Sequence, residues 1–282
     1  MRPSSLAVIG LGAIGGSLAW QARRAGVQRV IGFSPERTEG IEALKASAVT
    51  DLADTPLRAV RGADLVVLAV PPRATLDLIA ELATALEPGA LLTDVCSVKA
   101  PVVKQAEAAR IGDRFAGAHP LAGTHESGFA SASPDRLDGC VVYICETATP
   151  GGHRAADHVA SFWEQTLNAS AIRIGAESHD RQLAWTSHLP QAVAYALARS
   201  LAQHGQPGVS YGSGARDTTR LASSNPDMWV DILLYNQPAV SEALIQTEAQ
   251  LSELRRLLER GDAAALQSFL SEAQLFRKGI DR

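Results

Sequence analysis

The sequence predicts an α/β protein, in which a doubly wound parallel sheet is followed by an all-helical region. Up to about residue 174, short apolar runs alternate with helical segments, and a glycine-rich turn follows the first run. From residue 175 onward, the apolar residues recur only at helical spacing. We therefore expect a first domain over residues 1–174 and a second, helical domain over residues 175–282. The chain of 282 residues suffices for two domains of roughly 100–200 residues each.

The first apolar run and the turn after it predict a dinucleotide-binding site. Residues 6–9 (LAVI) read as a buried strand, and Gly10, Gly12 and Gly15 follow at the GxGxxG spacing. The first glycine permits a tight turn, the second lets a pyrophosphate approach the backbone, and the third lets the next helix pack on the strand. A glycine turn without a ligand is the alternative, but strand, turn, helix and second strand occur in the order of a Rossmann-type fold. We expect the following residues to contact the cofactor: Gly10, Gly12, Ala13, Ile14 and Gly15.

The end of the second strand, expected over residues 27–33, bears on the choice of coenzyme. An acidic residue at this point would bind the ribose 2′-hydroxyl of NAD. Ser34 and Arg37 can instead bind the 2′-phosphate of NADP, whereas Glu36 would repel that phosphate or serve NAD. The sequence slightly favours NADP over NAD, with Ser34 and Arg37 as cofactor-binding residues.

Polar residues follow the later strands, where ligands bind in sheets of this kind. Strands are expected over residues 63–70, 90–95, 114–118, 139–145 and 169–174, with helices over 73–86 and 152–167. At their ends we expect Val70, Pro71 and Asp94 to contact the cofactor. Ser97, Lys99 and His119 also lie at these ends, so the chemistry should take place there.

His119 is the strongest candidate for a catalytic base. A nicotinamide cofactor carries the hydride chemistry, so the protein must supply orientation and a group that takes the substrate's proton. The imidazole of His119 can accept the hydroxyl proton of an alcohol, and Ser97 on the neighbouring loop can fix its tautomer. A structural histidine in a loop is the alternative for His119. Capping or packing explains His179 as well as ligand binding does.

The helical region adds two arginines and an amphipathic helix. Arg216 and Arg220 are four residues apart on a predicted helix, which suits a dicarboxylate but also fits surface arginines bridged to neighbours. Over residues 177–204 we expect one helix kinked at Pro190 or two helices meeting there. The helix over residues 238–260 carries apolar residues at coiled-coil-like spacing. We expect a homodimer interface here, although a face packed within one subunit would show the same pattern.

Composition argues against several other classes of protein. The net charge of −4 gives no electrostatic reason to expect a nucleic acid or an anionic membrane as partner. The 3 cysteines form no metal-ligand spacing, which favours a reducing compartment without a metal site. No signal peptide or membrane span is recognisable. We expect a cytoplasmic protein that acts on a small molecule.

Four motifs resemble the prephenate and arogenate dehydrogenase family of tyrosine biosynthesis. They are TDVCSVK at 93–99, GAHPLAGTHESG at 117–128, SHLP at 187–190 and RDTTRLASSNPDMW at 216–229, and they occur in the family's order. The resemblance spans about residues 6–275. It implies a homodimeric enzyme that oxidatively decarboxylates prephenate or arogenate with hydride transfer to NADP or NAD.

The resemblance also implies roles for individual residues. By this likeness His119 is the catalytic histidine, which accepts a hydrogen bond from the ring hydroxyl, and Ser97 assists it. Arg220 would hold a substrate carboxylate. The substrate pocket would also include Thr124, His188, Arg216 and Trp229, the last reaching across the dimer.

Two departures from the family pattern leave the choice of substrate open. His125 stands where prephenate-preferring members often have glutamate, and Gln191 stands where many have a second histidine. Two other interpretations remain. A β-hydroxyacid dehydrogenase would need a catalytic lysine in the helical domain, where only Lys278 occurs. A nicotinamide-sensing protein would need no catalysis.

Overall fold

An eight-stranded sheet is the centre of this computed structural model, which describes residues 3–123, 128–205 and 210–280. The chain runs outward from β1 to β3, returns to β4 on the other side of β1, and continues to β8, in the order β3-β2-β1-β4-β5-β6-β7-β8. The loops after β1 and β4 therefore meet where the strand order reverses, which is the ligand-binding point of such sheets. The predicted doubly wound sheet is confirmed. Its strands are β1 Ser5–Ile9, β2 Arg29–Phe33, β3 Asp51–Leu52, β4 Leu65–Leu68, β5 Leu91–Asp94, β6 Phe115–Pro120, β7 Val141–Glu146 and β8 Ser170–Arg173.

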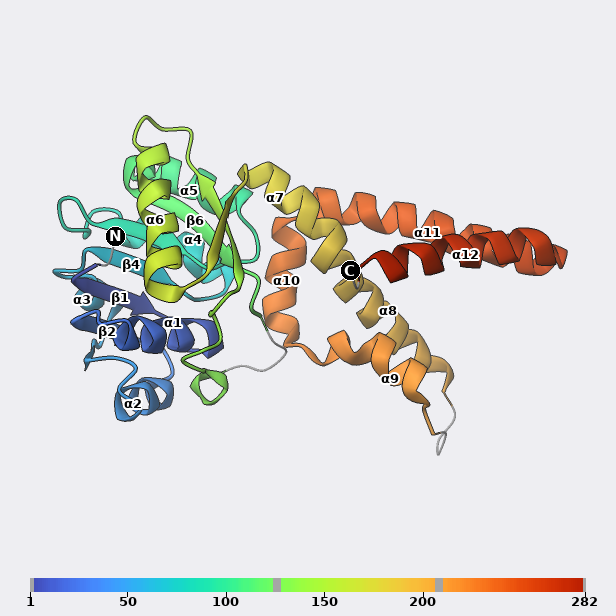
Figure 1. Ribbon diagram of the computed structural model, residues 1–282, viewed down its shortest axis with the longest axis horizontal. Helices are drawn as coiled ribbons and strands as arrows, with labels where there is room; N and C mark the ends of the chain where they lie inside the picture. The colour runs from blue at the N-terminus through green and yellow to red at the C-terminus, as the bar shows by residue number, and fades with distance from the viewer. Residues whose placement is uncertain (1–2, 124–127, 206–209, 281–282) are drawn as a thin grey trace. The chain divides into compact units, whose positions relative to one another are not determined.

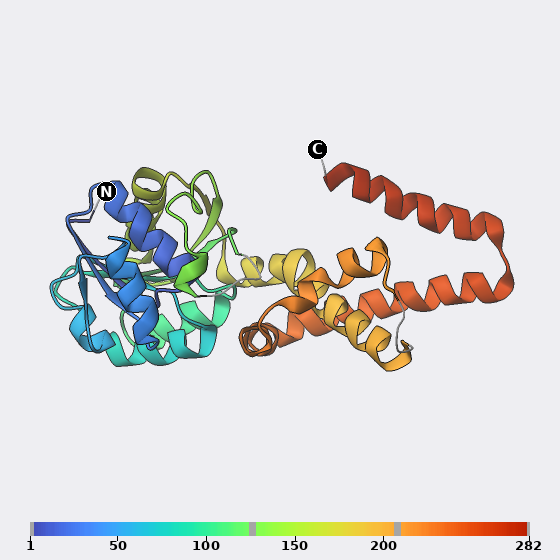
Figure 2. The same cartoon turned by 90° about the horizontal axis from the view of Figure 1, so that it is seen from below.

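Helices cover both faces of the sheet because its strands are apolar on both faces. Leu6 and Val8 of β1 pack into one hydrophobic core together with α1 and α6, whereas Ala7 and Ile9 pack into a second core with α3, α4 and α5. Figure 2 shows these two layers on opposite sides of the sheet. The helices are α1 Ala13–Arg24, α2 Arg37–Lys45, α3 Pro56–Ala59, α4 Pro72–Leu82, α5 Ala100–Ala108 and α6 Gly152–Leu167.

β7 differs from the expected all-parallel arrangement because it runs antiparallel to β6, with His119 opposite Tyr143. Parallel neighbours need a crossover connection, usually a helix. The link from β6 to β7 contains only the short 3₁₀ turn η2, Phe129–Ser131, among its described residues. The chain therefore returns alongside β6, and β8 then pairs parallel to β7.

A continuous helical rod follows the sheet (Figure 1). Pro190 neither breaks it nor divides it into separate helices, because a π-helical turn, η3, directly precedes α8. Proline lacks an N–H group and crowds the carbonyl one turn earlier, and a wider turn accommodates both effects. None of the helices within the described ranges is long and apolar enough to cross a membrane. The elements are α7 Ala176–Leu183, η3 Ala184–His188, α8 Leu189–His204, α9 Ser213–Thr219, η4 Arg220–Ser223 and α10 Pro226–Tyr235.

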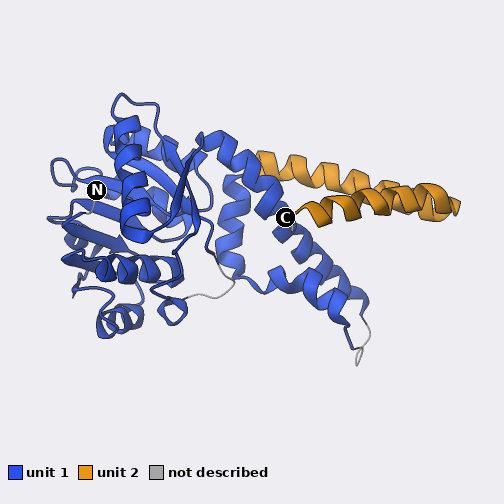
Figure 3. Ribbon diagram, viewed as in Figure 1, with its two compact units in different colours: residues 1–236 blue, residues 237–282 orange. Residues whose placement is uncertain are grey.

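The chain divides into two compact units, residues 1–236 and 237–282 (Figure 3). The second unit is a helical hairpin of α11, Gln237–Arg260, and α12, Ala263–Ile280, joined at Gly261 with φ +65°. The boundary expected at 174/175 falls inside the first unit, where Val98 packs with Trp229 and Ile232 of α10. That boundary stays a prediction of the sequence.

Candidate active site

The glycine loop after β1 fits a dinucleotide. A Cβ atom on Gly10, at φ +97°, would overlap the carbonyl of Ala69, and one on Gly15 would overlap the carbonyl of Gly10. Packing within the protein therefore explains both of these glycines. A Cβ on Gly12 would come no closer than 4.0 Å to a described atom, the nitrogen of Gly128. Gly12 thus keeps open the space that a pyrophosphate needs in front of the N–H groups at the start of α1.

The loop after β4 lies against the glycine loop, as the strand order requires. A Cβ on Gly10 would lie 2.9 Å from Cγ1 of Val70. The hydroxyl of Thr75 donates to the carbonyl oxygen of Val70 at 3.2 Å, and Pro71 is exposed as the N-cap of α4. The structure therefore brings Val70 next to the glycine loop, which supports its predicted contact with the cofactor.

The end of β2 holds a carboxylate that the sequence analysis missed. Ser34 Oγ donates a hydrogen bond to Oε2 of Glu39 at 2.6 Å. Arg37, the first residue of α2, is exposed. The sequence did contain a sign of this carboxylate, because Glu39 falls in the first turn of the helix expected after β2, where the helix dipole favours an acidic residue.

A chain of two imidazoles and a carboxylate is buried at the carboxyl end of β6. Nδ1 of His119 lies 2.9 Å from Nε2 of His179 in α7, and Nδ1 of His179 lies 2.7 Å from Oδ1 of Asp180. The three residues are at most 8% exposed. The sequence left capping, packing and ligand binding equally open for His179, because its partner His119 lies 60 positions away. The only local signal was the adjacent carboxylate.

This chain fixes the tautomer of His119. The carboxylate of Asp180 accepts backbone N–H bonds at both oxygens, from Lys99 at 2.7 Å and Ala100 at 2.8 Å, so it acts as an acceptor towards His179 as well. His179 therefore carries its proton on Nδ1 and accepts through Nε2. His119 then donates from Nδ1, and its Nε2 keeps a free lone pair.

Burial keeps the histidines neutral. It lowers the pKa of His119 well below the usual range, and the pKa is lowered further by the positive charge of Lys99 and by the charges that His179 and His188 would carry if protonated. Burial also lowers the pKa of His179, against the opposing effect of the hydrogen bond that His179 donates to Asp180, and lowers the pKa of His188 to about 4. A neutral His119 is a proton acceptor near pH 7.

A buried ion pair holds the loop between β5 and α5. Nζ of Lys99 pairs with Asp94 and donates to the carbonyl of Ala118 at 2.8 Å, and the N–H of Cys96 donates to Asp94 at 2.9 Å. The side chains of Lys99 and Asp94 have no exposed surface. The expected contact of Asp94 with the cofactor stays a prediction, since its visible partners belong to the loop.

Ser97 lies half-buried in the same loop. Among the hydrogen bonds of the described residues, none joins its hydroxyl to His119, whose Nδ1 bonds to His179 instead. His179 therefore takes the tautomer-fixing role that the sequence analysis gave to Ser97. A role for Ser97 in assisting His119 stays a prediction.

Two buried N–H donors lie close together beside this chain. Asn236 donates to the carbonyl of Asp180 at 2.7 Å and to Nδ1 of His188 at 3.0 Å, so neutral His188 carries its proton on Nε2. The rings of His188 and Trp229 meet edge to face, with centroids 6.1 Å apart. Nε1 of Trp229 has no hydrogen-bond partner among the described atoms, and Nε2 of His188 has none at full hydrogen-bond geometry, although the backbone of Ser97 lies close enough to oppose the effect of burial on the pKa of His188. A buried unpaired donor calls for an explanation, and an oxygen of a bound ligand supplies one.

The two arginines predicted on one helix belong to two different elements. Helix α9 ends at Thr219, and Arg220 begins the 3₁₀ turn η4, which Gln191 joins to α8 by donating to the carbonyl of Leu221 at 2.6 Å. Gln191 lies one turn beyond His188, so Arg220 starts a segment that is tied to the neighbourhood of His188. Both arginines are exposed. Arg216 lines a hollow of about 500 Å³ between α8 and α9, with Leu201, Tyr211 and Thr219 among its other lining residues.

Two residues singled out in the sequence, Thr124 and His125, lie outside the described residues. Within the described ranges, no group of three or more histidine, cysteine, aspartate or glutamate side chains is arranged to hold a metal ion.

These features define a dinucleotide-dependent oxidoreductase, with a glycine loop at the switch point of the sheet and a neutral imidazole at its carboxyl edge. Two family models match the chain: "Prephenate dehydrogenase, nucleotide-binding domain" over residues 18–172 and "Prephenate dehydrogenase, dimerization domain" over residues 175–272. The chain belongs to the prephenate dehydrogenase family. The resemblance drawn from the four motifs is confirmed, and the two other interpretations are not favoured.

Individual relatives match over nearly the whole chain. The cyclohexadienyl dehydrogenase of Zymomonas mobilis is 34% identical, over 98% of this chain and 95% of its own. The crystal structure of prephenate dehydrogenase from Aquifex aeolicus, in complex with hydroxyphenyl propionate and NAD+, has a TM-score of 0.90 at 30% identity and 98% coverage of both chains. The Synechocystis arogenate dehydrogenase has a TM-score of 0.80 at 27% identity, covering 98% of this chain and 99% of its own.

Alanine substitutions in the glycine loop will separate folding from cofactor binding. We expect Gly12→Ala to weaken NAD+ binding at least about 10-fold because its methyl group occupies the pyrophosphate's space, while Tm stays unchanged. The matched variant Gly15→Ala should lower Tm because its methyl group overlaps the carbonyl of Gly10. Calorimetric titration and thermal melts measure both effects. Normal NAD+ affinity in Gly12→Ala would contradict the assignment of the loop.

The buried histidines make stability depend on pH. The unfolded chain protonates them below about pH 6.5, whereas the folded protein holds His188 neutral down to about pH 4. Since the unfolded state then binds more protons, the free energy of unfolding falls as the pH drops from 6.5 to 4. The slope is up to about 1.4 kcal/mol per pH unit for each such ring. Denaturant titrations should show a smaller slope for His188→Gln and an unchanged slope for His204→Gln, an exposed control. Equal slopes in all three proteins would refute this assignment.

Proposed function

We propose that His119 is the catalytic base of an oxidative decarboxylation of prephenate or arogenate, with hydride transfer to a nicotinamide dinucleotide. The observation that carries this assignment is the chain from His119 through His179 to Asp180, which leaves Nε2 of a neutral imidazole free to accept a proton. Membership of the prephenate dehydrogenase family supports the reaction. The NAD+ in the Aquifex aeolicus complex supports the cofactor class.

His119 manages the proton of the substrate's ring hydroxyl. Nε2 takes up this proton as a hydride leaves the carbon that bears the hydroxyl. A bound nicotinamide ring supplies the acceptor for that hydride. The bond to the ring carboxylate then breaks, and its electron pair makes the ring aromatic. Carbon dioxide leaves, and His119 returns its proton to the phenolic oxygen. Loss of carbon dioxide and aromatisation make the reaction effectively irreversible.

His179 and Asp180 act as positioning residues in this scheme. When Nε2 of His119 takes the proton, the ring becomes an imidazolium, which Nδ1 already anchors to His179. The negative charge of Asp180, one ring further away, favours this cation. The pair therefore orients the base and stabilises its charged form.

The substrate's carboxylates need donors, and this neighbourhood supplies them. The N–H groups of His188 and Trp229 are suited to one carboxylate oxygen each. Arg220 supplies a guanidinium for a second carboxylate, and Arg216 and Thr124 complete the proposed pocket. Prephenate and arogenate share the cyclohexadienol ring and these carboxylates, so the proposal covers both.

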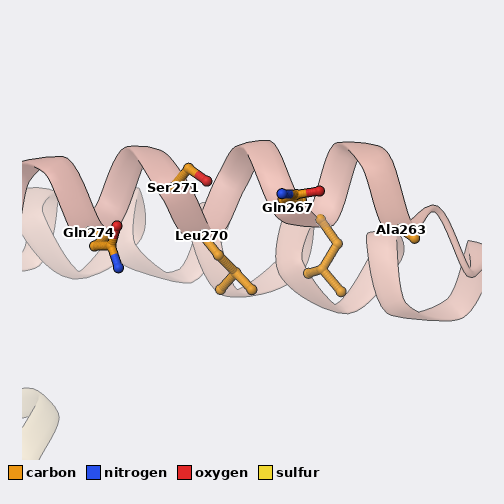
Figure 4. A pocket seen from close by; sticks show the side chains of 6 residues that line it. Ala263, Gln267, Leu270, Ser271 and Gln274 are labelled. Carbon is orange, nitrogen blue, oxygen red and sulfur yellow. The ribbon is translucent and has the colours of Figure 1, made fainter.

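The helical hairpin supports a homodimer. Its helices leave large apolar side chains more than half exposed, and a soluble chain covers such a surface by association. A shallow hollow of about 300 Å³ on α12 is lined only by neutral side chains of that helix (Figure 4). The matching family model is described as a dimerization domain. The exposed residues are Ile245, Leu251, Leu258, Leu270, Leu275, Phe276 and Ile280.

Four parallel assays test the proposed reaction. Prephenate and arogenate are each combined with NAD+ and NADP+, and the absorbance of reduced nicotinamide is followed. We expect turnover of at least one cyclohexadienyl substrate, with release of one carbon dioxide for each reduced nicotinamide. A folded protein that is inert in all four assays would refute the proposal.

Replacement of the proposed base tests its role. We expect His119→Asn to lower kcat by a factor of about 100 to 10,000, the range of a general base, with little change in KM. The exposed His204→Asn is the matched control and should keep normal kcat. Near-normal turnover in His119→Asn would exclude the role, provided that its Tm shows a folded protein.

Charged residues on α12 should disrupt the dimer. We expect the double variant Leu275→Glu, Phe276→Glu to sediment as a monomer of 29.7 kDa, whereas the unaltered chain sediments at twice that mass. Gln250→Glu, which adds a charge at an exposed position of α11, should remain dimeric. A monomeric unaltered chain, or a dimer that withstands both charges on α12, would contradict this interface.

A further inference from the structure

The carboxylate of Glu39 lies beside the end of β2, in the first turn of α2. Glu39 is the third residue of α2, and Ser34 at the end of β2 donates to its Oε2 at 2.6 Å. The glycine loop is joined to the same strand end, because the N–H of Gly10 donates to the carbonyl of Phe33 at 2.7 Å. In this fold the ribose next to the adenine lies between the glycine loop and the end of the second strand.

Gly128 locates the carboxylate relative to the pyrophosphate site. A Cβ on Gly128 would lie 3.5 Å from Oε1 of Glu39, and a Cβ on Gly12 would lie 4.0 Å from the nitrogen of Gly128. One residue therefore separates Glu39 from the glycine that keeps the pyrophosphate site open. The carboxylate is only half-buried, and Oε1 remains an acceptor after Oε2 has bonded to Ser34.

The charges at this point oppose a phosphate. The hydroxyl of Ser34, which the sequence analysis offered to a 2′-phosphate, is already donated to Glu39. None of the ion pairs found within the described ranges involves Glu39, so no basic partner neutralises it. Arg37 is two positions away on the same helix, so it does not face Glu39.

We propose that Glu39, oriented by Ser34, selects NAD over NADP: its carboxylate accepts a hydrogen bond from the ribose 2′-hydroxyl and repels a 2′-phosphate. This inference rests on the proposed nicotinamide-dependent function. It reverses the slight preference for NADP that Ser34 and Arg37 indicate in the sequence, because the hydroxyl of Ser34 donates its hydrogen bond to the carboxylate of Glu39. The acidic residue comes from the first turn of the helix, five positions beyond Ser34.

Calorimetric titration of the full-length protein with NAD+ and with NADP+, without substrate, tests this selection. We expect the unaltered protein to bind NAD+ at least about 10-fold more tightly than NADP+. Glu39→Gln keeps the side chain's size and removes its charge. It should shift the ratio of the two dissociation constants towards NADP+ by about 10-fold or more. Equal affinity for both coenzymes in the unaltered protein, or an unchanged ratio in Glu39→Gln, would overturn the proposal.

Two further variants separate the position of the charge from its sign. Glu36→Gln removes an exposed carboxylate that precedes the same helix and should leave the ratio unchanged. An equal shift in Glu36→Gln would mean that net charge alone acts, and would overturn the role of Glu39. Ser34→Ala should shift the ratio less than Glu39→Gln does, and no shift would remove Ser34 from the proposal. Because binding is measured without turnover, an inactive protein that distinguishes NAD+ from NADP+ would refute only the proposed reaction.

Discussion

The carboxylate of Asp180 is the contact on which the geometry of the candidate site depends. Its two oxygens accept the backbone N–H groups at the start of α5, and Oδ1 also accepts the proton of His179. One side chain at the start of the helical rod therefore fixes both the loop after β5 and the imidazole chain that ends at His119. A buried carboxylate is stable only with this many donors, so the three contacts support one another.

The buried Lys99–Asp94 ion pair also stabilises the loop between β5 and α5. Both side chains are fully buried, and removal of one partner would leave an unpaired charge in the core, at a cost of about 3–5 kcal/mol. Lys99 also bonds to the carbonyl of Ala118, the residue before His119. The pairing of β5 with β6 and this ammonium group thus both join the loop to β6, the strand that carries His119. Such a rigid frame suits a base that must lie within hydrogen-bond distance of the substrate's hydroxyl.

Local patterns in the sequence were enough to predict the fold, the glycine loop and the placement of His119. Apolar runs and the GxGxxG spacing depend on neighbouring residues, and they correctly identified seven of the eight strands. β3 was missed because it has only two residues. The antiparallel direction of β7 was missed because it depends on how a long connection returns. The contact between His119 and His179 was missed because the two residues are 60 positions apart in the sequence. The hydrogen bond from Ser34 to Glu39 was missed because a bond between two side chains leaves no periodic pattern in the sequence.

The π-helical turn at Ala184–His188 also determines which way the histidines face. His179 and His188 are nine positions apart, and in a regular α-helix that interval is about 2.5 turns, which would put the two rings on opposite sides of the rod. A wider turn takes up extra residues without completing an extra revolution, so it rotates His188 back towards the side occupied by His179. Asn236 then joins the two parts of the rod, because its amide donates both to the carbonyl of Asp180, next to His179, and to the ring of His188.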